Sequence, residues 1–253
     1  MALEALIFDV DGTLADTERD GHRVAFNQAF VEAGLDWRWD VALYGELLAV
    51  TGGKERMRHY IYRHRPDYRK PADFDALVAR LHIAKTRHYT ALLGRGGIPL
   101  RLGVRRLLEE ARTRGVRLAI ATTTTPDNVI ALLRHAVSPE AESWFEVIGA
   151  GDVVAKKPAP DIYYYVLDRL RLSPAQCIAF EDSENGLRAA QAAGLKTVIT
   201  VNDYTRAHDF RGAAIVLDHL GEPDRPFQVL SGYAVNGATC LDLKLLGQLL
   251  TYA

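Results

Sequence analysis

Short apolar runs, each followed by polar residues, recur along the chain and predict the strands of a sheet. The clearest run is Leu6-Ile7-Phe8, which meets Asp9 at once. Similar runs occupy residues 116–121, 147–148, 177–180, 197–201 and 213–217. Continuous apolar runs of this length are typical of parallel strands that are buried on both faces.

Segments with helical periodicity separate several of these runs. They cover residues 104–114, 127–135, 160–170 and 186–193, and each opens or closes at a glycine, a proline or a capping residue. The alternation predicts an α/β fold with a Rossmann-like parallel sheet and crossover helices. A last apolar stretch, 241–250, is helix-like, and packing is the only role that we assign to it.

One long interval, from Asp16 to Leu93, contains helical periodicity only. Phe26, Phe30 and Val31 share one face of a first predicted helix. Three more helices are predicted from apolar positions at Val41, Tyr44, Leu47 and Leu48, at Met57, Tyr60 and Ile61, and at Leu77, Leu81, Ala84 and His88. We therefore expect a small all-helical cap domain at 16–93, inserted into a core made of 1–15 and 94–253. The glycines of 94–99 predict a hinge at its return.

Composition supports a folded enzyme-sized protein and excludes several other classes. A length of 253 residues fits one large domain or a core with an insert, given about 150 residues per domain. Lys and Arg total 31 against 32 Asp and Glu, so no global positive field exists to hold nucleic acid or an anionic membrane. Two cysteines do not form a disulfide framework, and no leader or membrane-spanning run is apparent. We expect a cytoplasmic protein, a monomer or weak oligomer, with a small-molecule partner.

The predicted strands end in polar side chains that suit one particular chemistry. Ligands of open α/β sheets bind at the carboxyl ends of the strands. Those ends carry Asp9-Val10-Asp11-Gly12, Thr122 to Thr125, Lys156-Lys157-Pro158 and Glu181-Asp182-Ser183. Each segment alone is more often structural: the first a turn and helix cap, the threonines a strand end, the lysines a solvated loop and the last a helix cap. Together they supply carboxylates, hydroxyls and a cation, a set that suits a phosphoryl group and a divalent ion.

Four segments resemble the motifs of a known family in the family's order. FDVDGTLADTE, IATTTT, KKPAPDIYY and EDSENGLRAA are similar to the four motifs of the haloacid-dehalogenase-like hydrolase superfamily, and the resemblance covers nearly the whole chain. The helical insert resembles that of the subgroup with a small cap, which includes β-phosphoglucomutase and many sugar-phosphate phosphatases. The segment ADTERDGHRVAFNQAF is most similar to the Calvin-cycle phosphatases that act on xylulose 1,5-bisphosphate.

The resemblance implies a role for each motif. It makes Asp9 a nucleophile that forms an aspartyl phosphate, and Asp11 the general acid and base. Thr122 and Lys157, the lysine directly before the proline, would contact the transferring phosphoryl group. The implied Mg²⁺ ligands are Asp9, Glu181, Asp182 and the carbonyl oxygen of Asp11. The presence of Asp11 favours a phosphatase or phosphomutase over a dehalogenase.

The predicted cap supplies candidate substrate ligands. The loop Thr51 to Arg56 combines glycines with cations, and Lys54 aligns with an arginine that contacts the distal phosphate in the mutases. The substrate-binding candidates are Glu18, Gly52, Gly53, Lys54, Arg56 and Thr123. Many relatives carry Asp-x-x-x-x-His near the start of the cap. Counted from Asp16, this chain has Gly21 at the histidine position and His22 one residue later, a departure that weakens the mutase interpretation.

The resemblance thus implies a Mg²⁺-dependent phosphatase that converts xylulose 1,5-bisphosphate to xylulose 5-phosphate. One alternative is a β-phosphoglucomutase-type sugar phosphomutase, and another is a phosphatase for a different small ester such as 2-phosphoglycolate. A non-catalytic phosphate-binding module is a third alternative. Receiver domains also cluster Asp, Thr and Lys at strand ends, but they are far shorter and lack a cap.

Overall fold

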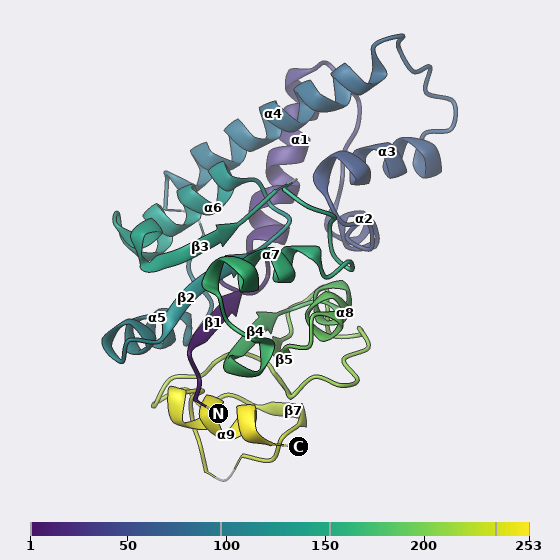
Figure 1. Ribbon diagram of the computed structural model, residues 1–253. Helices are drawn as coiled ribbons and strands as arrows, with labels where there is room; N and C mark the ends of the chain where they lie inside the picture. Colours follow the sequence, from purple (N-terminus) through teal and green to yellow (C-terminus); the bar gives the residue numbers. More distant parts are fainter. Residues whose placement is uncertain (1, 97, 152, 236, 253) are drawn as a thin grey trace.

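The computed structural model describes residues 2–96, 98–151, 153–235 and 237–252. In this part of the chain a seven-stranded sheet has the order β3-β2-β1-β4-β5-β6-β7 (Figure 1). Its strands are β1 (Ala5–Phe8), β2 (Arg117–Ala121), β3 (Phe145–Gly149), β4 (Cys177–Glu181), β5 (Lys196–Thr200), β6 (Ile215–Leu217) and β7 (Val229–Gly232). All neighbours pair in parallel except β6 and β7, which are antiparallel. The predicted α/β fold is confirmed.

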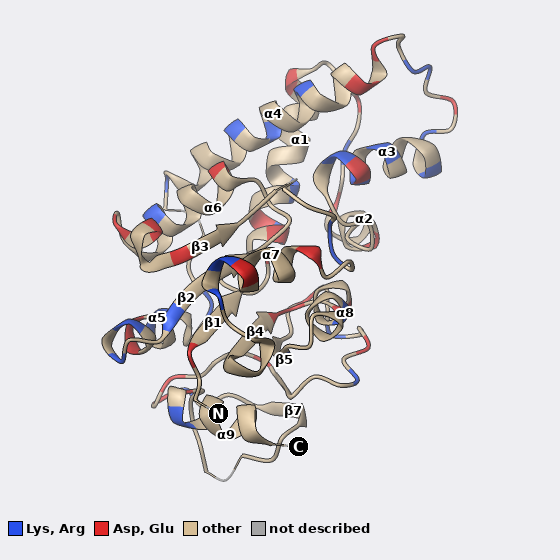
Figure 2. Ribbon diagram, in the orientation of Figure 1, with Lys and Arg blue, Asp and Glu red and all other residues tan. Residues whose placement is uncertain are grey.

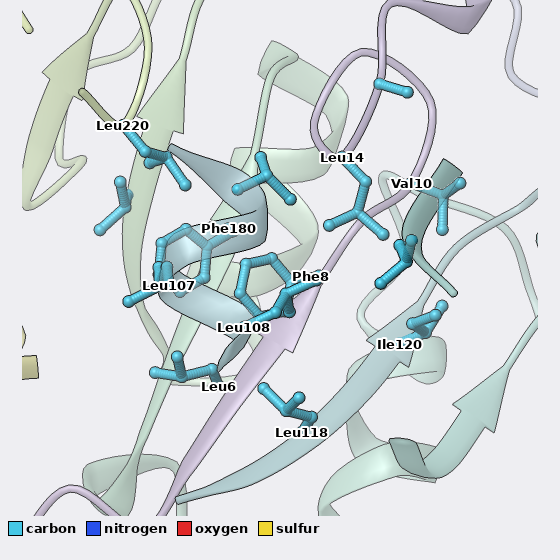
Figure 3. Packing of buried hydrophobic residues seen from close by; sticks show 14 of the residues in the cluster. Leu6, Phe8, Val10, Leu14, Leu107, Leu108, Leu118, Ile120, Phe180 and Leu220 are labelled. Carbon is cyan, nitrogen blue, oxygen red and sulfur yellow. The ribbon is translucent and has the colours of Figure 1, made fainter. Parts of the chain in front are cut away.

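Strand β1 lies at the centre of the sheet and is buried on both faces. Phe8 pairs with Ile120 of β2 and Phe180 of β4, and the rings of Phe8 and Phe180 stack with centroids 4.4 Å apart. On this face they pack with Leu107 and Leu108 of α5 (Val104–Thr113), as Figure 3 shows. Because both faces of the strand are covered, its residues form a continuous apolar run and not an alternating one.

Helices cover the two faces of the sheet in the manner that the periodicity predicts. One face carries α5, α6 (Pro126–Leu132) and the last helix, α9 (Leu243–Thr251), and the other face carries α7 (Asp161–Leu170) and α8 (Glu184–Ala192). The predicted C-terminal packing helix is α9, whose leucines 245, 246, 249 and 250 are buried. Strand β7 has no predicted counterpart, because all of its residues are exposed and no apolar alternation marks it.

Between β1 and β2 the described chain forms a helical layer that stands apart from the sheet (Figure 1). It comprises a π-helical turn (Glu18–His22), α1 (Arg23–Glu32), α2 (Val41–Leu47), α3 (Gly53–His64) and α4 (Phe74–Leu93). The layer has its own aromatic core, which includes Phe26, Phe30, Trp37, Trp39 and Tyr60. The division at 15/16 and 93/94 stays a prediction, and Gly97 of the predicted hinge lies outside the described residues.

Two apolar side chains that predict the cap helices are exposed in the structure, Val31 of α1 and Val41, the first residue of α2. Phe26 and Phe30 of α1 are buried as predicted, but Val31 is 74% exposed, so its assignment to this face is wrong. Phe26 and Phe30 are four residues apart and share a side of the helix, whereas Val31 is rotated about 100° from Phe30. The buried side of α1 consists of Ala25, Phe26, Ala29 and Phe30, and Val31 lies outside it.

Arg101 ties the chain that returns from α4 to the sheet. Its side chain is buried and donates hydrogen bonds to the carbonyl oxygens of Thr200 (2.9 Å), Val201 (2.5 Å) and Asp218 (3.0 Å), and to that of Gly12. One guanidinium therefore joins the segments that leave β1, β5 and β6.

Charge is spread over the surface. Figure 2 shows residues of both signs along α3, α4 and α5 in this view, and no side of the drawing carries one sign alone. This agrees with the net charge of −1. Among the described helices, none combines the length and the apolar character that a membrane span requires.

Candidate active site

The four predicted motif segments meet at the carboxyl ends of the parallel strands. Asp9 follows β1, and its N–H donates to Phe180 O at 3.0 Å, so the strand pairing continues up to the candidate nucleophile. Thr122 follows β2 in the same way, with its N–H 2.9 Å from Gly149 O. A cavity of about 240 Å³ opens above these ends. Its lining includes the predicted residues Asp9, Asp11, Glu18, Gly52, Arg56, Thr122, Thr123, Lys157, Glu181 and Asp182.

Lys157 is the cation at the bottom of this cavity. Its Nζ lies 2.7 Å from Asp9 Oδ1, 2.5 Å from Glu181 Oε1 and 2.8 Å from Ala121 O. Burial alone would lower the pKa of this ammonium, but Asp9 and Glu181 together raise it above its usual value. Lys157 is therefore held protonated. Its neighbour Lys156 turns away and pairs with Glu55 at 2.8 Å.

Three buried carboxylates share the space beside Lys157. Oxygen atoms of Asp9, Glu181 and Asp182 all lie within 4.8 Å of one another. Burial raises the pKa of Asp9 to about 7, and Lys157 opposes this shift while Glu181 adds to it. Burial, Asp9 and Glu181 also raise the pKa of Asp182 well above its usual value. For all three carboxyl groups to be ionised at this distance near neutral pH, the site needs more cationic charge than one lysine provides.

The donor set fits a divalent cation. Glu181 Oε2 is buried and has no hydrogen-bond partner among the described residues, although Lys157 and Tyr163 both bond to Oε1. Asn202 Nδ2 donates to Asp182 Oδ2 at 2.7 Å and fixes the orientation of that carboxylate. Hard oxygen ligands of this kind are those that Mg²⁺ prefers.

Gly12 makes room for this group of carboxylates. It has a φ of +83°, in the left-handed region, and a Cβ at this position would lie 2.3 Å from Asp182 Oδ2. The chain can therefore turn sharply after Asp11 and still pass beside Asp182 only if the residue is glycine.

Asp11 is held by two donors from one short segment. Its Oδ1 accepts hydrogen bonds from Thr17 Oγ1 at 2.5 Å and His22 Nε2 at 2.7 Å, and Oδ2 has no partner among the described residues. Burial would raise the pKa of Asp11, but His22 and then Thr17 lower it below its usual range. The shifted position of the histidine in the sequence therefore does not remove it from Asp11. Asp20 is exposed and pairs weakly with Arg19.

Lys85 of α4 sets the state of His22. Its Nζ lies 2.7 Å from His22 Nδ1. A protonated lysine can only donate, so Nδ1 accepts and the ring proton is on Nε2, which faces Asp11. Burial lowers the pKa of Lys85 to about 8, and the nearby carboxylates of Asp11 and Glu18 limit the decrease.

The opposite wall belongs to the helical layer. Tyr44 of α2 donates a short hydrogen bond to Glu18 Oε2, and Arg56 Nη1 donates to the Tyr44 hydroxyl oxygen at 2.8 Å. Arg56 is buried and lies 3.9 Å from Glu18. These contacts point Glu18, a predicted sugar ligand, into the cavity.

A smaller cavity of about 60 Å³ adjoins the first. Both cavities share Asp11, Glu18, Gly52, Arg56 and Thr123 in their walls. The predicted ligands Gly53 and Lys54 line only the smaller one, with Asn128 and Lys156 from the core. The loop candidates therefore face a second compartment next to the carboxylates.

Several residues of the site have no signal in the sequence. Tyr44, Lys85 and Asn202 belong to none of the four motif segments, and each acts through a partner that is distant along the chain. Thr17 lies in the first segment, but nothing in that segment indicates its contact with Asp11. Tyr163, in the third motif segment, is buried, and its hydroxyl bonds to Glu181. The sequence contains no local pattern that indicates any of these contacts.

Comparison with known proteins agrees with this geometry. The model of the haloacid dehalogenase-like hydrolase family matches residues 3–194. Protein CbbY (plasmid) of Cupriavidus necator is 51% identical over 225 residues, which cover 88% of each chain. A phosphorylated carbohydrates phosphatase of Thermotoga maritima is 32% identical over 212 residues, or 79% of this chain and 85% of the relative.

A solved structure adds a ligand to the comparison. A variant of CbbY from Rhodobacter sphaeroides in complex with xylulose-(1,5)bisphosphate is 46% identical and superposes with a TM-score of 0.78. The match covers 86% of this chain and 94% of that structure.

Proposed function

The chain belongs to the haloacid dehalogenase-like hydrolase family and is a phosphatase that acts on sugar phosphates; from this premise we propose that it removes the 1-phosphate of xylulose 1,5-bisphosphate with the help of Mg²⁺. The observation that carries the substrate is the 46% identical CbbY structure with that bisphosphate bound. We also propose that residues 16–93 form a cap that closes over the substrate. A cytoplasmic location stays a prediction.

Asp9 is proposed as the nucleophile. Its carboxylate oxygen attacks phosphorus, and the bond from phosphorus to the sugar oxygen breaks. The negative charge of the bound phosphate favours the protonated form of Asp11, which gives its proton to the leaving sugar oxygen. In the second step Asp11 takes a proton from water, whose oxygen attacks phosphorus and breaks the bond to Asp9. Asp11 Oδ2 is suited to this exchange because Thr17 and His22 occupy only Oδ1.

The surrounding residues stabilise charge on the transferring group. Lys157 is held protonated beside Asp9, and Thr122 presents its hydroxyl in the same cavity. Asp9, Asp182, Glu181 and the carbonyl oxygen of Asp11 would hold Mg²⁺. When bound, this ion offsets the repulsion between the phosphate dianion and the carboxylates.

The two adjoining cavities fit a substrate with phosphates at both ends. The reacting phosphate would lie against Asp9 in the larger cavity, with sugar hydroxyls near Glu18 and Thr123. The distal phosphate would then reach the loop that carries Gly52, Gly53, Lys54 and Arg56, where glycine N–H groups and cations are close.

A sugar phosphomutase is the second candidate, and one observation favours it. His22 bonds to Asp11 at 2.7 Å, and the resemblance to the mutases implies a histidine that positions this aspartate and delays hydrolysis. The two functions differ in whether the phosphate is released to water or returned to the sugar.

The experiment that tests the proposal measures inorganic phosphate released in the presence of Mg²⁺. Xylulose 1,5-bisphosphate is compared with ribulose 1,5-bisphosphate, 2-phosphoglycolate and β-glucose 1-phosphate. A clear preference in kcat/KM for the xylulose compound is expected. Uniformly slow hydrolysis, or formation of glucose 6-phosphate from the glucose ester, would overturn the substrate assignment.

Lys54 tests the distal phosphate site. Replacement by alanine is expected to raise KM for xylulose 1,5-bisphosphate roughly tenfold or more, because a charge-assisted contact of about 1.5–3 kcal/mol is lost. KM for a monophosphate such as p-nitrophenyl phosphate is expected to change little. Arg58→Ala is the control, since Arg58 follows on the same helix and pairs with Asp75 on the surface. An equal effect of Lys54→Ala on both substrates would contradict the role.

A further inference from the structure

The turn that leads into α1 is wider than an α-helical turn. Residues Glu18–His22 are π-helical, and the N–H of Arg23 donates to Glu18 O five residues back. Helix α1 begins directly at Arg23. Such single π turns usually interrupt α-helices and often lie at functional sites. The path from Thr17 to α1 thus contains one residue more than an α-helix would need.

The wide turn brings two donors to one oxygen atom. Thr17 and His22, five residues apart, both bond to Asp11 Oδ1, at 2.5 Å and 2.7 Å. In an α-helix, side chains five residues apart point in directions about 140° apart. Because a π turn closes after one more residue, it places the two side chains on the same side. The contact of His22 with Asp11 therefore depends on the shape of this turn.

Gly21 is the residue that lets the turn lie against its neighbours. A Cβ at this position would be 2.6 Å from Ile98 Cδ1 and 2.9 Å from Tyr89 Cε2. The ring of Tyr89 also stacks on His22, with centroids 4.0 Å apart. A larger residue at position 21 would displace the end of the Ile98 side chain and also the ring of Tyr89 or the turn itself. The displacement would reach His22 directly.

The spacing between Asp16 and His22 indicates that Gly21 is an additional residue. A pattern Asp-x-x-x-x-His that starts at Asp16 would place histidine at position 21, where this chain has glycine, and the histidine follows at 22. We infer that Gly21 is a positioning residue: it is an additional residue that the π turn absorbs, and it keeps His22 hydrogen-bonded to Asp11. The inference rests on the proposed role of Asp11 as acid and base.

The inference is tested with variants in which residue 21 is replaced, deleted or preceded by an inserted glycine. The substrate is phenyl phosphate with Mg²⁺, because it contains no sugar and its leaving group benefits from a proton given by the enzyme. Gly21→Ala, and insertion of one glycine after Asp20, are each expected to lower kcat roughly tenfold or more with little change in KM. Deletion of Gly21 places the histidine four residues after Thr17, so that an α-helical turn can bring both side chains to Asp11. The kcat of this variant is expected to stay within about threefold of the wild-type value. Asp20→Ala, an exposed change in the same turn, is the control.

A double variant separates positioning from general damage. If Gly21 acts through His22, Gly21→Ala lowers kcat no further when it is added to His22→Ala. Thermal unfolding of each variant shows that it is folded. Wild-type kcat in Gly21→Ala and in the insertion, or effects that add to those of His22→Ala, would overturn the inference. Wild-type turnover in Asp11→Asn would instead overturn the proposed role of Asp11.

Discussion

At the scale of single residues, the active site collects carboxylates whose charges oppose one another. Asp9, Glu181 and Asp182 lie within 4.8 Å, and Lys157 is the buried cation bonded to two of them. Burial and mutual repulsion therefore raise the pKa of Asp9 and that of Asp182. The stability of the protein should then depend on both pH and metal.

The shifted pKa of Asp9 determines whether the free energy of unfolding rises or falls with pH. Its pKa is about 7 in the folded protein and near 3.8 in the unfolded chain, so between these values the folded state binds more protons. The free energy of unfolding consequently falls as pH rises through this window. In EDTA, the wild type is expected to lose melting temperature between pH 5 and pH 7.5 relative to Asp9→Asn, which has no such carboxyl group.

Mg²⁺ is expected to reverse the loss in the wild type, because a ligand that binds only the folded state stabilises it. Asp9→Asn should respond much less to the ion and should have no phosphatase activity. Asp20→Asn, an exposed change, is the control. Melting curves of wild type and Asp9→Asn that stay parallel over the whole pH range would contradict the assignment.

Sequence reasoning found the residues that act within a motif and missed those that act across the fold. Asp9, Asp11, Thr122, Lys157, Glu181 and Asp182 follow strands whose apolar runs are easy to recognise. Lys85 and Tyr44 lie on α4 and α2 of the helical layer, and they contact His22 and Glu18 only because of tertiary packing. No local pattern marks such contacts.

At the scale of elements, the positions of buried strands and helices could be predicted from the sequence, whereas exposed elements could not. The strands β1 to β6 follow their apolar runs, whereas β7 is exposed throughout and carries no such run. The π turn was unpredictable for a different reason, because a single additional residue leaves the hydrophobic periodicity of α1 unchanged. The histidine spacing counted from Asp16 shows an additional residue, but the hydrogen bond from Arg23 to Glu18 is what shows that a π turn contains it.

Helix α9 shows how an element outside the family match contributes to the core. The family model ends at residue 194, and α9 covers the same face of the sheet as α5. Leu246→Ala is expected to reduce the free energy of unfolding by about 2–5 kcal/mol, because it leaves a cavity beneath a fully buried side chain. Denaturant unfolding measures this loss.

Gln248→Ala is the matched control for that change, since Gln248 is exposed on the same helix. The kcat of Leu246→Ala, measured well below its melting temperature, should stay near that of the wild type. A loss under 1 kcal/mol would show that α9 is dispensable for the core.

At the scale of the whole molecule, the site is shared between two layers. The sheet supplies the carboxylates and Lys157, and the helical layer supplies Glu18, His22 and Arg56. The layers also touch through Lys156 with Glu55, at 2.8 Å, and Asn185 with Thr51, at 3.2 Å. The sequence predicted both layers, but which side chains meet between them depends on how the layers are docked.

The guanidinium of Arg101 joins the segments that leave β1, β5 and β6. Because of this, limited proteolysis can be used to follow the opening of the segment between α4 and α5. Trypsin needs an accessible arginine, and Arg101 is buried whereas Arg95, on the same stretch, is exposed. Of these two sites, Arg95 is therefore expected to be cleaved before Arg101, which becomes accessible only when this segment opens locally. Vanadate with Mg²⁺, an analogue of the transferring phosphoryl group, should slow the cut at Arg101 more than the cut at Arg95. The ratio of the two fragments, followed by mass spectrometry, would report how often the segment between the two layers opens during turnover.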